Sequence, residues 1–134
     1  MLKKEITYTD FDGNERTETF YFNFTQAEIA EMELTHPGGF ANHIKRIIAA
    51  SEYPVIVKLF KDIILKSYGE KDETGRRFVK SKEMAEAFSQ TAAYSKLFIE
   101  LATDDQAAAD FVNAILPKEL MDQDKPALAQ PDKE

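Results

Sequence analysis

The pattern that most constrains the fold is an alternation of apolar and polar side chains on both sides of an Asp-Gly turn. The alternation runs through residues 2–10, breaks at DFDGN (residues 10–14) and resumes up to residue 24. Period-two alternation around such a turn predicts a β-hairpin. A two-stranded hairpin alone is marginal in water, so we expect its apolar face to be core rather than a binding face. The residues of that face are Leu2, Ile6, Tyr8, Phe20, Phe22 and Phe24.

After the hairpin, capping signals and spaced apolar residues predict a series of short helices. Thr25 and Glu28 have the spacing of a capping box, in which the Thr hydroxyl accepts from a helical amide and the Glu reaches back to the cap. This helix should run to about Leu34 and end before the turn-rich HPGG (residues 36–39). A second helix is expected over residues 40–50.

A third helix and a polar loop should occupy the middle of the chain. Ser51 and Pro54 are expected to open the helix, and Gly69 is placed to stop it. Residues 70–80 are polar and contain a glycine, which predicts a loop with a short extended piece at residues 77–79. The apolar stripe of the third helix consists of Val55, Ile56, Leu59, Phe60, Ile63 and Ile64.

The last part of the folded chain carries further helix signals. Ser81 can cap a helix that runs through Phe88, and another helix follows it. The TDD run at residues 103–105 caps the last helix, with acidic groups at the positive end of its dipole, and Pro117 ends it. The apolar faces of these last two helices consist of Tyr94, Leu97, Phe98 and Leu101, then Phe111, Val112 and Ile115.

The sequence therefore predicts one mainly α domain with a small N-terminal β-hairpin, an α+β fold of about five helices. The domain should span residues 1–116, with the hairpin in residues 1–24 and the helical part in residues 25–116. At 134 residues, the chain is long enough for one core. Residues 117–134 contain two prolines among charged and small residues, which predicts a flexible C-terminal tail.

Composition narrows the class of partner. The formal net charge is −7, whereas a general phosphate-backbone binder needs a basic stripe. We therefore expect no nucleic-acid partner, and an acidic surface is equally poorly suited to anionic membrane. Such a surface could complement a basic protein, although solubility alone explains it.

The chain contains no cysteine, which excludes disulfides, thiolate nucleophiles and cysteine-based zinc sites. The N-terminal MLKKEI lacks the apolar run of a signal peptide. The most apolar segment, residues 55–65, is interrupted by charged residues and is too short to span a bilayer. We expect an intracellular, soluble protein.

The residues that could support catalysis or metal binding are not arranged in a recognisable motif. His36 and His43 have no accompanying ligand spacing. The acidic pairs around Asp10 and Asp104 are explained by a turn and a helix start, and no serine lies in a nucleophile motif. We therefore expect no enzyme activity, no cofactor and no metal site.

One local basic cluster combines Lys71, Arg76, Arg77 and Lys80 with the aromatic Phe78. Such a combination can follow a nucleic-acid strand. Because the domain as a whole is acidic, we favour a solvated loop with Phe78 anchored to the core.

Several sequence blocks, taken in order, resemble one family. Among them are LKSYGE (residues 65–70), GRRFVKS (residues 75–81) and FSQT (residues 88–91). The likeness also covers residues 6–10, 12–14, 20–23, 31–34, 61–69, 87–91, Tyr94 and 101–103. In these blocks the chain resembles the tail assembly chaperones of long-tailed bacteriophages, in particular the short product of a frameshifted gene pair.

The resemblance implies a chaperone that coats the tape measure protein, a very long helical chain, in the cytoplasm of the bacterial host. It also implies a longer product that diverges within residues 117–134 and recruits the major tail protein. At 134 residues, we expect this chain to be the product without that extension. Self-association and the partner-binding residues stay open.

The alternative is a structural component, such as a tail-tube or head–tail joining protein, that remains in the virion. A small enzyme or ligand-binding domain is a different class, and it would need a polar pocket with perturbed pKa values. The sequence contains no signal for such a pocket.

Overall fold

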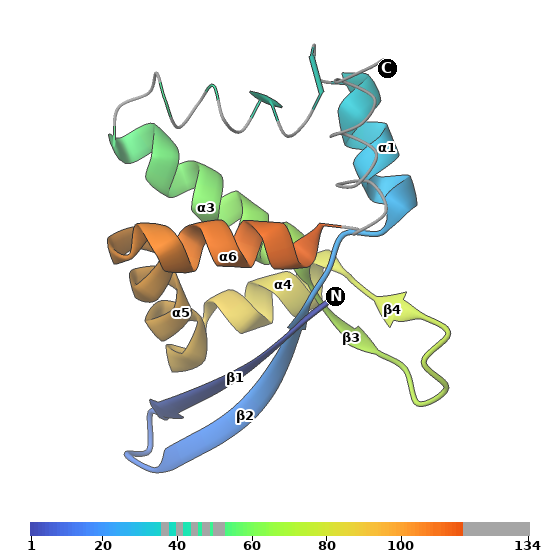
Figure 1. Ribbon diagram of the computed structural model, residues 1–134. Coiled ribbons are helices and arrows are strands. Elements are labelled where there is room, and N and C mark those ends of the chain that lie inside the picture. The colour runs from blue at the N-terminus through green and yellow to red at the C-terminus, as the bar shows by residue number, and fades with distance from the viewer. Residues whose placement is uncertain (36–37, 40–41, 44–45, 47–48, 50–52, 117–134) are drawn as a thin grey trace.

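The computed structural model describes residues 1–35, 38–39, 42–43, 46, 49 and 53–116. Within them, the helices share a core with a small antiparallel sheet, so the expected α+β, mainly α class is confirmed. Figure 1 shows two hairpins that diverge from a common root beside the helices. The elements are β1 (Leu2–Thr9), β2 (Glu15–Phe22), α1 (Gln26–Thr35), α3 (Tyr53–Ser67), β3 (Tyr68–Lys71), β4 (Phe78–Val79), α4 (Lys82–Ser89), α5 (Ala92–Thr103) and α6 (Asp105–Ile115).

The first hairpin forms as the alternation predicts. β1 and β2 pair antiparallel from Leu2↔Phe22 to Thr9↔Glu15. The connecting turn has Gly13 at φ +86°, a left-handed conformation that glycine adopts without steric cost. Ile6 and Phe22 are buried, so the even-numbered face of the hairpin packs against the helices. The interpretation of this face as core is confirmed.

The sheet extends beyond the first hairpin, which the sequence pattern did not predict. The strand order is β1-β2-β3-β4, and β3 pairs with β2 only at Tyr21↔Gly69 and Phe22↔Tyr68. The prediction of a loop over residues 70–80 was wrong at its start, because β3 and β4 form a second hairpin. The extended piece at residues 77–79 is confirmed by β4.

Gly69 has a different role from the one its position suggested. The preceding helix, α3, ends at Ser67, and Gly69 is a buried strand residue rather than a helix stop. A Cβ atom at this position would lie 2.7 Å from the Phe78 ring and 2.8 Å from the Val79 carbonyl oxygen. Glycine is needed here because the two strands approach closely.

The predicted caps are present at the helix starts. The Thr25 hydroxyl accepts from Glu28 N–H at 3.2 Å, and the Glu28 carboxylate accepts from Thr25 N–H at 2.8 Å, which is the capping box. Ser81 caps α4, and the Asp104 carboxylate accepts from two amides of α6. These local signals place the helix starts correctly.

The core lies where the hairpin root meets α3, α4, α5 and α6. Phe22, fully buried, has ring centroids of Tyr68, Phe88 and Phe111 within 5.3–5.8 Å. Three expected core residues lie further out. Ile56 and Val112 are only partly buried, and Val55, in the first turn of α3, is 49% exposed. The predicted helix over residues 40–50 lies largely outside the described residues, and the predicted tail at residues 117–134 lies wholly outside them. None of the described helices is both long and apolar enough to cross a membrane.

Candidate protein-interaction surface

Among the described residues considered for chemistry, the acidic ones have structural contacts. In the part of the chain that the structure describes, no three His, Asp or Glu side chains are grouped so that they could hold a metal ion. Asp104 caps α6, and Asp10 belongs to the first turn. His43 lies on a described position of the predicted second helix, and His36 lies outside the described residues.

The basic residues Lys71, Arg76, Arg77 and Lys80 of the second hairpin do not all point to the same side. Lys80 points inward: its Nζ lies 2.8 Å from Glu28 Oε2 and 2.9 Å from the Lys66 carbonyl oxygen, over the Phe24 ring. Arg76 and Arg77 are exposed at the tip of the hairpin. Phe78 is partly buried, and its ring lies close to Gly69 of β3. The cluster therefore does not present a continuous basic face.

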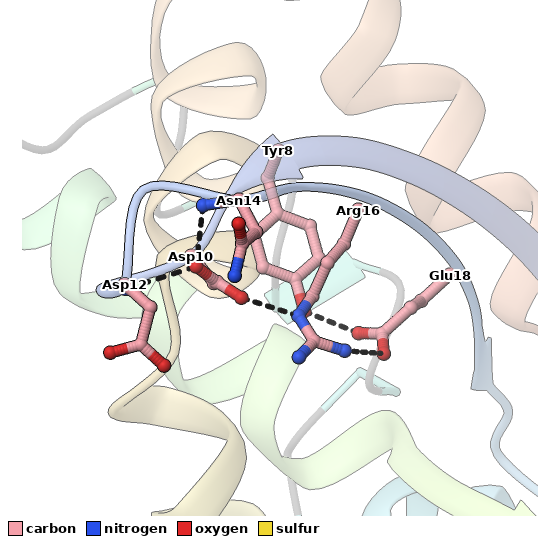
Figure 2. A network of polar contacts seen from close by, with 6 residues as sticks. All are labelled: Tyr8, Asp10, Asp12, Asn14, Arg16 and Glu18. Carbon is pink, nitrogen blue, oxygen red and sulfur yellow. Dashed lines mark hydrogen bonds and ion pairs between the residues drawn. The ribbon is translucent and has the colours of Figure 1, made fainter.

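A polar network forms at the tip of the first hairpin (Figure 2). The Asp10 carboxylate accepts from the backbone N–H groups of Asp12 and Asn14, each at 2.9 Å, and Arg16 Nε donates to it at 2.6 Å. Arg16 also lies 3.7 Å from Glu18, which accepts from the Tyr8 hydroxyl. These contacts connect the turn to the first residues of β2.

The hydrogen bonds of this network shift the pKa values of Asp10 and Tyr8. The hydrogen bond from Arg16, helped by the backbone amides, lowers the pKa of Asp10. The pKa of Tyr8 is raised, first by its hydrogen bond to Glu18 and then by burial. The Asp10 shift indicates that the network stabilises its charged carboxylate, and the Tyr8 shift indicates that it stabilises the neutral hydroxyl.

β2 has an open edge close to this network. β1 pairs with all of β2, whereas β3 pairs only with Tyr21 and Phe22. Within the described residues, no strand pairs with the other side of residues 15–20, and Thr17 and Thr19 are exposed. We call residues 15–20 on this side the open edge. An unpaired strand edge is a ready template for another strand.

Where β3 leaves β2, the surface is hollowed. This notch is lined by residues 18–21 of β2 and by all four residues of β3. Phe20, Tyr21 and Tyr68 are among the residues that line it, and the Lys71 ammonium lies over the Tyr21 ring. The notch is continuous with the open edge, since both share residues 18–20.

The opposite edge of the hairpin is covered. α5 packs along β1, and Lys96 donates to the Thr7 carbonyl oxygen at that edge. Lys4 forms an ion pair with Glu100 of α5 at 3.2 Å. The two edges of one hairpin therefore differ in their availability to a partner.

Large apolar side chains are also exposed outside the sheet. Phe11, in the first turn, is 84% exposed, and Leu34, near the end of α1, is 88% exposed. Val55 and Ile99 are exposed on α3 and α5. Single exposed apolar residues are common, but apolar contacts are what a protein partner would use.

Sequence reasoning did not find these interaction features. The diagonal contact of Tyr8 with Glu18 follows from the hairpin register, so it could have been found from the turn position. The open edge and the notch depend on where β3 joins β2, and β3 itself was not predicted.

Comparison with known proteins adds a decisive observation. A family profile described as phage tail assembly chaperone matches residues 1–134. The chain belongs to the phage tail assembly chaperone family. Comparisons with curated proteins and with solved structures gave no match. Membership confirms the resemblance seen in the sequence and assigns this chaperone a role in tail assembly, through protein partners.

Proposed function

We propose that this chaperone binds the tape measure protein and keeps it soluble while the phage tail assembles in the host cytoplasm. The observation that carries the proposal is the family match over the whole chain. The proposed activity is binding without catalysis. In this proposal the protein acts during assembly, in contrast to a tail-tube or head–tail joining component retained in the virion.

The chemistry of the surface is compatible with such a client. A very long helical chain exposes apolar stripes before the tail tube surrounds it, and small domains can cover such stripes. Leu34 and Val55 offer exposed apolar contacts on either side, in sequence, of the segment between α1 and α3. Many copies along one polymer gain avidity even when each contact is weak.

Recruitment of the major tail protein is assigned, in this proposal, to a longer frameshift product. The short chain would coat the client, and an extension that replaces part of residues 117–134 would bring in tube subunits. The two products would then share the folded domain and differ in their C-terminal segments.

Co-expression with the tape measure protein of the same genome tests the proposal. We expect the long chain to be insoluble alone and to co-purify with many copies of the chaperone when both are made. The L34D/V55D variant should reduce this recovery, whereas I99D makes the same change at an exposed residue on another helix and serves as the control. If the tape measure protein does not bind the wild-type chain, and mass spectrometry finds the wild-type chain in stoichiometric amounts in virions, a structural role replaces the chaperone role.

A further inference from the structure

The direction of the backbone groups on β2 follows from the hydrogen bonds of the first turn. Asp10 N–H donates to the Asn14 carbonyl at 2.8 Å, so even-numbered residues of β1 and β2 exchange bonds with each other. The N–H and C=O groups of the odd-numbered residues of β2 therefore point away from β1. Tyr21 and Asn23 follow this rule: Tyr21 pairs with Gly69, and Asn23 N–H donates to the Ser67 carbonyl. At the open edge, the same groups of Thr17 and Thr19 face outward.

We propose that the open edge pairs with the open edge of a second copy of this chain, antiparallel and about a two-fold axis at Thr17. In this register, residue 17 faces residue 17 of the partner, and residues 15 and 19 face each other. All three positions are odd-numbered, so their outward groups can form the ladder of an antiparallel pair. The result would be a continuous sheet through two molecules.

Charge selects this register over its neighbours. With the axis at Thr17, Arg16 of each copy lies opposite Glu18 of the other, and the contact occurs twice. An axis at residue 16 would place Arg16 opposite itself, and an axis at residue 18 would place Glu18 opposite itself. Opposite charges directly across a strand pair are stabilising and like charges are destabilising. Arg16 and Glu18 are also in a non-hydrogen-bonded pair, where side chains approach most closely.

The two-fold axis at Thr17 would also bring the first turn of each copy to the notch of the other. In this register, Asn14 of one copy lies opposite Phe20 of the other, and the turn therefore reaches the notch between β2 and β3. Phe11, at 84% exposure, lies in that turn, and three aromatic residues are among those that line the notch. We expect Phe11 of each copy to pack in the partner's notch, which would bury an otherwise solvated ring twice per dimer.

The pairing should stop at two copies. The outer edge of β1 is covered by α5, and β4 at the other end of the sheet has two residues. A contact that uses the same edge on both copies is isologous and closes on itself. The proposal does not depend on which client the chaperone binds.

A single cysteine tests the position of the axis, since the chain contains none of its own. With T17C, the two introduced residues would face each other with Cα atoms about 5.5 Å apart, within disulfide range. T7C is the matched control, because Thr7 pairs with Thr17 on the same exposed face but lies one strand further out. Its Cα atoms would be roughly 15 Å apart in the dimer. We expect mild oxidation to link T17C efficiently and T7C hardly at all; equal linking of the two variants overturns the proposal.

A charge-exchange experiment tests the register by analytical ultracentrifugation. R16E makes the edge acidic at both positions, and E18R makes it basic at both positions. Each variant alone should dimerise roughly tenfold more weakly than wild type, because two attractive pairs become repulsive. A mixture of the two variants should form a heterodimer, since every pair is again of opposite sign. Circular dichroism must first show that each variant folds. A wild-type protein that stays monomeric over the accessible concentrations, or a mixture that gives no heterodimer, contradicts the proposal.

Discussion

The root and the tip of the first hairpin have the same pair of strands but opposite environments. At the root, Phe22 is fully buried among rings from β3, α4 and α6. At the tip, Phe11 is 84% exposed, and a polar network holds the turn (Figure 2). The root therefore builds the core, whereas the tip is held by polar contacts without being buried. An ordered and exposed element is suited to a protein partner, because little conformational entropy is lost when it binds.

The largest expected difference comes from the same substitution at both ends. F22A should lower the free energy of unfolding by about 3–5 kcal/mol, since it removes a buried ring and leaves a cavity. F11A should change it by less than about 0.5 kcal/mol, because the ring is solvated. Urea unfolding followed by circular dichroism measures both. Comparable losses in the two variants would mean that the tip is part of the core.

The second prediction concerns the contact that joins the root to the second hairpin. G69A should cost roughly 2 kcal/mol, because the added Cβ would lie too close to the Val79 carbonyl oxygen and the Phe78 ring. G75A is the control: Gly75 has open space around it but a φ of +76°, so only backbone strain of about 1 kcal/mol is expected. Hydrogen exchange should show faster opening of β3 and β4 in G69A. Protection equal to that of the wild type would contradict the close approach of the strands.

A third prediction tests the charged contact on the root side. K80M keeps the apolar stem over Phe24 but removes the contacts with Glu28 and with the Lys66 carbonyl. Because Glu28 is partly exposed, we expect a loss of only about 1 kcal/mol. K82M removes a charge from an exposed residue of α4 and should have almost no effect in the same thermal unfolding measurement. If the two substitutions act alike, the Lys80 contacts do not stabilise the fold.

The parts of the fold that could be predicted from the sequence are those set by neighbouring residues. The capping box of Thr25 and Glu28, the Ser81 cap and the first hairpin each depend on a few adjacent side chains, and each is confirmed. β3 could not be predicted, because it pairs with only two residues of a strand far away in the sequence. Gly69 was misinterpreted for the same reason: the atoms that exclude a side chain there come from Phe78 and Val79. The interaction surface could not be predicted for the same reason, because the positions of the open edge and the notch depend on where β3 diverges from β2.

The smallest effect is expected at the tip, from D10N. Asp10 has a lower pKa in the folded hairpin than in the unfolded chain, because Arg16 and two backbone amides donate to its carboxylate. Its charge therefore stabilises the turn above the unfolded pKa of about 3.9, and this contribution is lost as the pH falls through the folded value.

In the wild type, NMR shifts of the Asn14 amide should change over this acidic range while those of Phe22 do not. D10N should show weaker protection of the turn at neutral pH and lose this titration. D12N removes a charge from the same turn without the Arg16 contact and should keep it. If D10N also lowers the hydrogen-exchange protection of Phe22, the two ends of the hairpin form one cooperative unit. The root and the tip would then differ in burial but not in local stability.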